Sequence, residues 1–319
     1  MKDKLQTAIR AVSKAAHICR EIQAQLVTED ALTKKDRSPV TIADFASQAI
    51  ICKTLKLKFP DIPIVGEEDA NSLRQKENKA LLDKIGKFLT GWTEEEILSS
   101  IDEGNSEAEG YFWTVDPIDG TKGFLRGEQY AVALALIENG QVQMGVLGCP
   151  NLTHEGKSNK GLIAYAIKGQ GAFTADLKGN DSHQVRVSQN SADELIRFLE
   201  SVEAGHANHK LQGQIMDALG DKAQSVRFDS QVKYAVLAQG IAEVYLRLPN
   251  ELKPDYRERI WDHAAGMIIV LEAGGRVTDM FGKNLDFTQG KSLLNNRGIM
   301  VSNGLVHDGI LDLINKFRK

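Results

Sequence analysis

The sequence has few cysteines, no excess of basic residues and no long apolar run, and each absence excludes a class of protein. Its three cysteines, Cys19, Cys52 and Cys149, lie far apart without zinc-like spacing, so we expect buried free thiols in a reducing compartment. The net charge of −4 argues against a nucleic-acid scaffold, which needs a basic face. No apolar run approaches the ~20 residues that span a bilayer, and the N-terminal segment lacks a secretory pattern. We therefore expect a cytoplasmic protein with no nucleic-acid or membrane partner.

Low-complexity tracts and internal repeats are also missing, so we expect little disorder. The 319 residues are 42% hydrophobic and 26% charged, which is typical of a soluble globular protein. This length favours one compact body of two lobes. We place the division near residue 155, with residues 1–155 forming an α+β lobe and residues 156–319 an α/β lobe.

The first 110 residues are predicted to be mainly helical. Residues 4–27 carry one apolar stripe at helical spacing. A second helix is expected over Thr41–Phe59, with Thr41 as its cap and Asp44 in its first turn. A short strand at Ile62–Val65 then leads into Gly66-Glu67-Glu68, and the polar stretch 71–104 is predicted to form two helical pieces separated by Gly91.

The rest of the chain alternates between strands and helices. Two apolar strands, Tyr130–Ile137 and Gln141–Leu147, flank Asn139-Gly140, which is a strong signal for an antiparallel hairpin. The segment 151–160 is polar and reads as a loop. Beyond it, strands are expected at Leu195–Leu199, Val226–Phe228 and Glu243–Leu246, and helices at 230–239 and Trp261–Ala273. This pattern is typical of a layered α/β lobe.

The segment Trp-Thr-Val-Asp-Pro-Ile-Asp-Gly-Thr-Lys-Gly at residues 113–123 carries the clearest functional signal. An apolar strand is predicted to end where Asp116 begins, because Pro117 biases the preceding residue toward extended geometry. Asp119 follows across a turn that Gly120 relaxes. Both carboxylates and the Ile118 carbonyl can then face one small volume, which provides the hard oxygen ligands that Mg²⁺ prefers.

Two further acidic residues are expected at the ends of regular elements, Glu67 after a strand and Asp262 at a helix start. Taken alone, each acidic residue is more simply a helix cap or a solvated charge. Taken with the turn at Asp116 and Asp119, they predict a site where magnesium ions assist the hydrolysis of a phosphate monoester.

Three motifs in this order resemble the lithium-sensitive, magnesium-dependent phosphatase superfamily that includes inositol monophosphatase. They are Gly66-Glu67-Glu68, the segment from Asp116 to Thr121, and Trp261-Asp262-His-Ala-Ala-Gly266. The stretches 38–44, 122–128 and 145–151 are more similar to its 3′(2′),5′-bisphosphate nucleotidase branch. The resemblance covers residues 5–310 and implies a two-lobe α-β-α-β-α layered sandwich with the active site between the lobes.

The resemblance also implies a division of labour within the acidic site. The metal ligands, for two to three Mg²⁺ ions, would be Glu67, Asp116, the Ile118 carbonyl, Asp119 and Asp262. Asp44 and Thr121 would orient and deprotonate the attacking water, because a hydroxyl can take a proton only if its own proton moves on to a base. The role of Glu68 stays open.

Substrate recognition is expected from the second lobe. Ser230 and Lys233 would share one helical face, and Arg247 on a strand could complete a clamp for a second phosphate. The resemblance adds His206 near an adenine, with Glu200 and Ser201 as weaker candidates, and it gives Thr121 and Asp262 substrate contacts as well. Without the resemblance, an isolated histidine and an exposed Lys-Arg pair are more simply surface residues.

The expected reaction removes the 3′-phosphate of adenosine 3′,5′-bisphosphate to give AMP and phosphate, and it could extend to 3′-phosphoadenylyl sulfate. The small-molecule substrate would be the only partner of a monomeric enzyme. An inositol phosphatase, acting on inositol 1-phosphate or inositol 1,4-bisphosphate, is the alternative enzyme. A catalytically idle adenine-nucleotide sensor is the alternative of another class.

Overall fold

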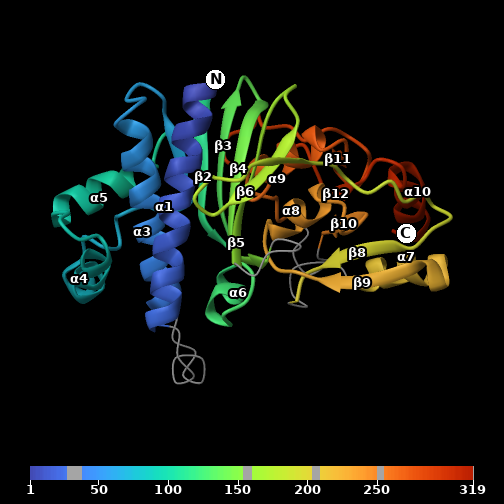
Figure 1. The fold of residues 1–319 in the computed structure, drawn as a ribbon, viewed down its shortest axis with the longest axis horizontal. Coiled ribbons are helices and arrows are strands. Elements are labelled where there is room, and N and C mark those ends of the chain that lie inside the picture. Colours follow the sequence, from blue (N-terminus) through green and yellow to red (C-terminus); the bar gives the residue numbers. More distant parts are fainter. Residues whose placement is uncertain (27–37, 154–159, 203–208, 250–254, 319) are drawn as a thin grey trace.

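The computed structural model describes residues 1–26, 38–153, 160–202, 209–249 and 255–318, and the elements alternate in layers of helices and sheets (Figure 1). Helices α1 (Lys2–Leu26) and α3 (Ser38–Lys56) form the first layer, against a seven-stranded sheet. Helices α8 (Val232–Ala238) and α9 (Ala264–Glu272) form the middle layer. A five-stranded sheet and helices α7 (His209–Leu219) and α10 (His307–Phe317) complete the fold. The predicted α-β-α-β-α sandwich is confirmed.

The seven strands of the first sheet lie side by side in chain order, β1 to β7. The pair β1–β2 is parallel and the other pairs are antiparallel. The strands are β1 (Ile64–Gly66), β2 (Tyr111–Asp119), β3 (Ala131–Glu138), β4 (Gln141–Thr153), β5 (Lys160–Ile167), β6 (Ala172–Asp176) and β7 (His183–Val185). Helix α6 (Thr121–Leu125) connects β2 to β3, and the predicted hairpin at Asn139-Gly140 is confirmed.

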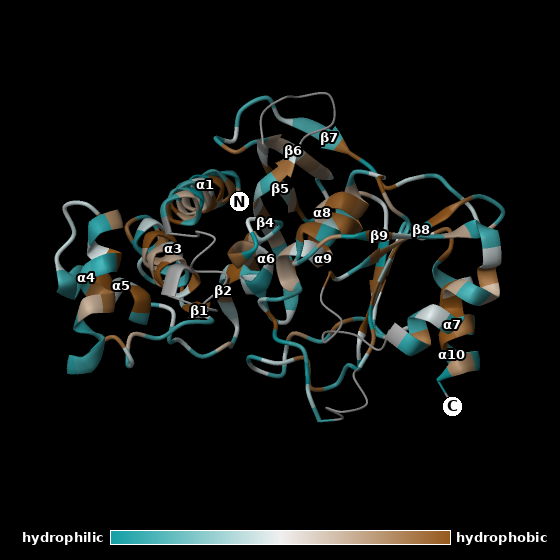
Figure 2. Cartoon of the chain, turned by 90° about the horizontal axis from the view of Figure 1, so that it is seen from below, coloured by the Kyte–Doolittle hydropathy of each residue, from teal (hydrophilic) through white to brown (hydrophobic). Residues whose placement is uncertain are grey.

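The two faces of this sheet differ in side-chain size. On β3, Val132, Leu134 and Leu136 belong to the apolar core with α1 and α3, whereas the alternate residues, mostly alanines, belong to the core with α8 and α9. On β4, a Cβ added at Gly145 would lie 2.6 Å from the Ala265 carbonyl oxygen. Small residues therefore allow α9 to pack close to the sheet, and in Figure 2 the apolar helices α8 and α9 lie between the two sheets.

The second sheet has the order β11-β12-β10-β8-β9, with β8, β9 and β10 parallel to one another and β12 antiparallel to β10. Its strands are β8 (Ile196–Glu200), β9 (Ala223–Arg227), β10 (Val244–Arg247), β11 (Arg276–Thr278) and β12 (Ile299–Ser302). Phe198 and Val244 pack with Ile310 of α10 in a separate apolar core on the outer face.

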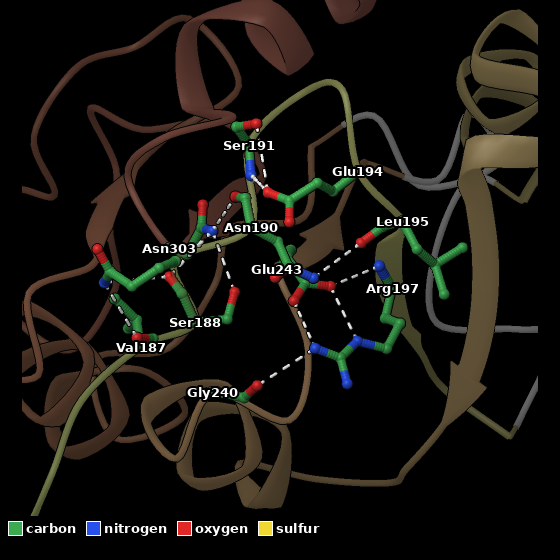
Figure 3. Close-up of polar contacts among 11 residues, drawn as sticks. Val187, Ser188, Asn190, Ser191, Glu194, Leu195, Arg197, Gly240, Glu243 and Asn303 are labelled. Carbon is green, nitrogen blue, oxygen red and sulfur yellow. Dashed lines mark hydrogen bonds and ion pairs between the residues drawn. The ribbon is translucent and has the colours of Figure 1, made fainter.

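The chain passes from the first sheet to the second through residues 186–195, which are held by buried polar groups (Figure 3). Asn303 donates hydrogen bonds to the Ser188 and Asn190 carbonyl oxygens at 3.2 and 2.8 Å. Glu243, whose side chain is fully buried, accepts from the Arg197 backbone N–H at 2.7 Å and pairs with the guanidinium of that residue at 2.6 Å. The predicted division near residue 155 therefore falls inside the first sheet, and the change of sheet lies between Val185 and Ile196.

The polar stretch after β1 forms helices α4 (Lys79–Phe88) and α5 (Glu94–Asp102) on either side of Gly91, as predicted. Helix α5 begins with a capping box in which the Thr93 hydroxyl accepts from the Glu96 N–H, and the Glu96 carboxylate accepts from the Thr93 N–H. Its carboxyl end packs beside α3 and so helps to shape the loop after β1.

Several predicted boundaries differ from the structure. Thr41 does not cap α3, which begins at Ser38 with a proline in its first turn, where a missing N–H costs nothing; the helix ends at Lys56 instead of Phe59. Strand β2 does not end before Asp116 but continues to Asp119, because a register shift absorbs Pro117 and pairing with β3 resumes. Helix α9 begins at Ala264, so Asp262 lies in the turn before it.

The three cysteines are free and buried, as predicted. Cys19 and Cys52 lie in α1 and α3, and Cys149 lies in β4. Burial raises the pKa of each of the three thiols. Among the described residues, no helix combines the length and the apolar character needed to cross a bilayer.

Candidate active site

The end of β2 places the first two carboxylates. Asp116 is 2% exposed and pairs with Ala133, while Asp119 pairs with Ala131 beyond the register shift. Helix α3 holds this irregular segment in place, because the Ser47 hydroxyl donates to the Pro117 carbonyl oxygen at 2.9 Å. Gly120 follows with a φ of 95°, a conformation that a residue with a Cβ rarely adopts, and so lets Thr121 begin α6.

The loop after β1 places Glu67, and one buried glutamine fixes the loop. Gln48 of α3 donates to the carbonyl oxygens of Glu68 and Ile101 at 2.5 and 3.0 Å, and it accepts from the Glu68 N–H at 3.0 Å. A Cβ at Gly66 would lie 2.6 Å from the amide oxygen of Gln48, so glycine is required for this close approach. The backbone on either side of Glu67 is therefore held rigidly to α3.

Asp44 lies on α3 behind this group of carboxylates. Burial raises its pKa well above the usual range, and the charges of Glu68 and Glu67 raise it further. The described residues show no hydrogen bond between Asp44 and Thr121, so the structure brings these two residues to one region without joining them directly.

The carboxylates repel one another, which is visible in their pKa values. Burial, followed by the charges of Asp262 and Glu68, raises the pKa of Glu67 to about 8. Burial also raises the pKa of Asp262 to about 6 although Arg247 lowers it, and burial with the charge of Glu67 raises that of Asp116 well above its usual range. Burial is the largest cause of each shift, and neighbouring carboxylates add to it.

This cluster fits a divalent cation. One carboxylate oxygen of Asp116 is buried and has no hydrogen-bond partner within the described residues, which is costly unless another group satisfies it. The neighbouring donors are also oxygens, which suits Mg²⁺ better than a softer metal. The residues present therefore match the metal predicted from the sequence.

Residues 230–247 bring a hydroxyl and cationic groups next to the carboxylates. Ser230 has a φ of 64°, and a Cβ at Gly120 would lie 2.8 Å from its Cβ, so the two turns are in close contact. The next N–H, of Gln231, donates to the Asp119 carboxylate at 2.5 Å. The turn that carries Ser230 is thus fastened directly to the turn that carries Asp119.

Lys233 and Arg247 lie beyond Ser230. The Lys233 ammonium donates to the Phe228 carbonyl oxygen at 3.2 Å and lies 5.1 Å from the centre of the Tyr245 ring. Its burial lowers its pKa to about 8, while the charge of Asp119 opposes this effect. Arg247, the last residue of β10, donates to the Asp262 carboxylate at 3.3 Å. Both cations therefore face the acidic cluster.

One cavity of about 440 Å³ joins these groups. Among the predicted site residues, those that line it are Glu67, Asp116, Ile118, Asp119, Thr121, Ser230, Lys233, Arg247 and Asp262. Of the two weaker candidates, Ser201 lines it and Glu200 does not, and Asp44 is not among the lining residues either. His206 lies outside the described residues.

Other lining or supporting residues were given no role from the sequence. Asp229 lines the cavity and forms an ion pair with Arg126 of the segment after α6. Tyr256 lines the cavity next to Arg247, and Glu258 lies behind that arginine. Arg126 stands inside the stretch 122–128 and Asp229 directly precedes Ser230, so their positions were a usable signal, whereas nothing in the sequence marks Glu258.

Comparison with known proteins agrees with this geometry. Residues 1–318 match the inositol monophosphatase family. A Candida albicans protein named 3′(2′),5′-bisphosphate nucleotidase 2 is 41% identical, over 99% of this chain and 97% of that protein. The 3′(2′),5′-bisphosphate nucleotidases of Schizosaccharomyces pombe and Dictyostelium discoideum are 43% and 42% identical, over 93% and 97% of this chain and 90% and 95% of their own lengths.

Solved structures show the same fold at lower identity. The Thermotoga maritima IMPase is 24% identical with a TM-score of 0.65, over 99% of this chain and 98% of that one. CysQ from Bacteroides thetaiotaomicron is 21% identical with a TM-score of 0.64, over 95% of this chain and 97% of that one. With the layered sandwich, the acidic cavity and a match along almost the whole sequence in agreement, the chain belongs to the inositol monophosphatase family.

Proposed function

We propose that this protein is a magnesium-dependent phosphatase that removes the 3′-phosphate of adenosine 3′,5′-bisphosphate and releases AMP and phosphate. The observation that carries the proposal is one cavity lined both by carboxylates and by Ser230, Lys233 and Arg247. The carboxylates suit the phosphate that reacts, and the hydroxyl and cationic groups suit a phosphate that does not react. The names of relatives about 40% identical support the nucleotide as substrate.

Two to three magnesium ions would be held by Glu67, Asp116, Asp119, Asp262 and the Ile118 carbonyl oxygen. When bound, these ions supply electrostatic stabilisation of the phosphoryl oxygens and of the leaving oxygen. The support for this ligand set is the buried, unpartnered oxygen of Asp116, together with the burial and, after it, the neighbouring carboxylate charges that raise the pKa values of Asp116 and Glu67. Glu68 is not included in this ligand set: Gln48 holds its backbone, and its charge adds to the burial that raises the pKa values of Asp44 and Glu67.

Thr121 and Asp44 would move the proton of the attacking water. The Thr121 hydroxyl lies at the cavity wall, at the first position of α6, and would accept the proton from water as it passes its own to the Asp44 carboxylate. The ionised Asp44 carboxylate would be the proton acceptor, and burial followed by the charges of Glu68 and Glu67, which raise its pKa, makes it a stronger base. The described residues show no hydrogen bond between the two groups, so this proton route requires Thr121 and Asp44 to come into contact during the reaction.

The second phosphate would be bound by the Ser230 hydroxyl, the Lys233 ammonium and the Arg247 guanidinium. Arginine can contact two phosphate oxygens at once, and a partly desolvated lysine interacts strongly with an anion. Asp262 would contact the substrate between the two phosphates, and His206 would lie near the adenine. 3′-Phosphoadenylyl sulfate, which also carries a charged group on the 5′ side, would be a second substrate.

The test is magnesium-dependent phosphate release from adenosine 3′,5′-bisphosphate, inositol 1,4-bisphosphate and inositol 1-phosphate at equal concentrations. We expect a strong preference for the nucleotide, and we expect Lys233→Met to raise its KM without a matching effect on inositol 1-phosphate. A preference for either inositol phosphate in the wild-type protein would overturn the substrate assignment but leave the metal site in place.

We also propose that the enzyme is a cytoplasmic monomer that lithium inhibits. The free, buried cysteines support a reducing compartment. Lithium would occupy a magnesium position without the charge that stabilises the phosphoryl oxygens. Turnover should fall in millimolar lithium and recover with added magnesium, and unchanged turnover would contradict this proposal.

A further inference from the structure

Arg247 lies between two carboxylates that have different tasks. Its Nε lies 2.8 Å from a carboxylate oxygen of Glu258, and its terminal nitrogen lies 3.3 Å from a carboxylate oxygen of Asp262. Both carboxylates raise the pKa of the arginine well above its usual range although burial lowers it. Asp262 faces the cavity, whereas Glu258 does not line it.

Glu258 is itself held from the side opposite the arginine. The Nε2 atom of His263 lies 3.2 Å from the Glu258 carboxylate, and the Nδ1 atom lies 2.8 Å from the Tyr234 hydroxyl. These contacts are consistent when Tyr234 donates to Nδ1 and the Nε2–H group donates to Glu258. Burial would raise the pKa of Glu258, but Arg247 and His263 outweigh it and lower the pKa, so Glu258 is a charged, oriented carboxylate.

Close packing fixes the far end of this chain of contacts. The Tyr234 ring is 1% exposed and meets the Tyr245 ring edge-on, with 5.3 Å between ring centroids. A Cβ at Gly266 would lie 2.3 Å from the Tyr234 ring, so α8 and α9 touch at this point. Tyr234 therefore cannot shift easily, and neither can His263, which is fully buried.

A separate metal site here does not fit the contacts. Glu258, Asp262 and His263 offer potential ligand atoms within 4.8 Å of one another. However, the guanidinium of Arg247 already contacts both carboxylates, and both ring nitrogens of His263 are engaged. In this cluster, the single positive charge of Arg247 is instead shared between the carboxylates of Glu258 and Asp262.

We propose that Glu258 is a positioning residue that draws Arg247 away from Asp262. This inference rests on the proposed function, in which Asp262 binds a cation and Arg247 binds a phosphate. Without the Glu258 charge, the guanidinium would settle on Asp262, the strongest remaining anion within reach. That pairing would neutralise a metal ligand and withdraw the arginine from the phosphate, so Glu258 keeps both groups available.

The test is a double-mutant cycle read by calorimetric binding of Mg²⁺ to the full chain without substrate. Glu258→Gln keeps the size of the side chain and an acceptor for His263 but removes the charge. We expect Mg²⁺ affinity to fall by on the order of tenfold in the wild-type background. In the Arg247→Met background the same substitution should change the affinity less than about twofold, because Glu258 acts through the arginine.

Asp308→Asn is the matched control. Asp308 lies in α10, outside the site, and its carboxylate is 80% exposed and paired with Arg276 of β11. We expect its Mg²⁺ affinity to match that of the wild type. Tyr234→Phe provides a second variant if Glu258→Gln does not fold, because it releases His263 and should shift Mg²⁺ affinity in the same direction by a smaller factor.

Equal weakening by Glu258→Gln in both backgrounds would show a direct charge effect and overturn the inference, as would unchanged affinity in the wild-type background. If the wild-type protein binds no Mg²⁺ at all, the proposed function itself is wrong and the inference falls with it. The two failures are therefore distinguishable in one set of titrations.

Discussion

The contact between Gln48 and the loop that carries Glu67 gives a prediction about both stability and metal binding. Gln48→Leu keeps nearly the same volume in a fully buried position but removes every hydrogen bond of the amide. The carbonyl oxygens of Glu68 and Ile101 and the N–H group of Glu68 then lose their hydrogen-bond partner. At about 1 kcal/mol or more for each group, the free energy of unfolding should fall by about 3 kcal/mol.

The same substitution should also weaken Mg²⁺ binding, because Glu67 is placed by the backbone that Gln48 holds. The assays are urea unfolding followed by circular dichroism, and calorimetric titration with Mg²⁺. Gln25→Leu, on the exposed side of α1, is the control and should change neither quantity. A loss of less than about 1 kcal/mol for Gln48→Leu together with unchanged Mg²⁺ affinity would refute the argument, because it would mean that water replaces the amide at no cost.

Three further predictions concern single titratable residues. Asp44→Asn should abolish turnover while AMP binding persists, since the amide cannot accept the proton from Thr121; turnover near the wild-type rate would refute the proton route. Because the Lys233 ammonium has a pKa of about 8, the KM for the bisphosphate should rise as the pH increases above that value. Lys233→Arg, which stays charged, should remove this rise, and a rise that persists in the variant would have another origin. Burial lowers the pKa of His307 to about 4, so the stability that its neutral form contributes should be lost as the pH falls from about 6.5 to 4. When the free energy of unfolding in urea is plotted against pH across that range, it should fall less steeply for His307→Gln than for the wild type. Parallel plots for the two proteins would exclude His307 as the cause.

Much of the site could be predicted because its residues stand in short, local patterns. Asp116 and Asp119 belong to one turn whose proline and glycine restrict the backbone, so their proximity follows from local geometry. The layered fold was predictable from periodicity at β3 and β4 and from the resemblance. The elements predicted between α1 and α9 are therefore present in the predicted order even where single boundaries moved, whereas α6, α7 and the strands β5 to β7 were not predicted.

The residues that escaped prediction depend on contacts between distant segments. Glu258 matters only because β10 brings Arg247 beside it, and no spacing in the sequence reveals that approach. The extension of β2 through Asp119 likewise depends on pairing with Ala131, which overrides the tendency of Pro117 to end a strand. The first sheet includes β5 to β7 for the same reason, since pairing between strands decides its extent.

The three buried cysteines can report when the layers of the fold that cover them open. A thiol-specific reagent such as a chromogenic disulfide can react only when a cysteine becomes accessible and ionised, and all three side chains are fully buried. Cys19 and Cys52 report on the helical layer that carries Asp44, and Cys149 reports on the strand against which α9 packs. Variants that retain one cysteine each would thus yield separate labelling rates for two layers, from which local opening can be told apart from global unfolding without introducing a new residue.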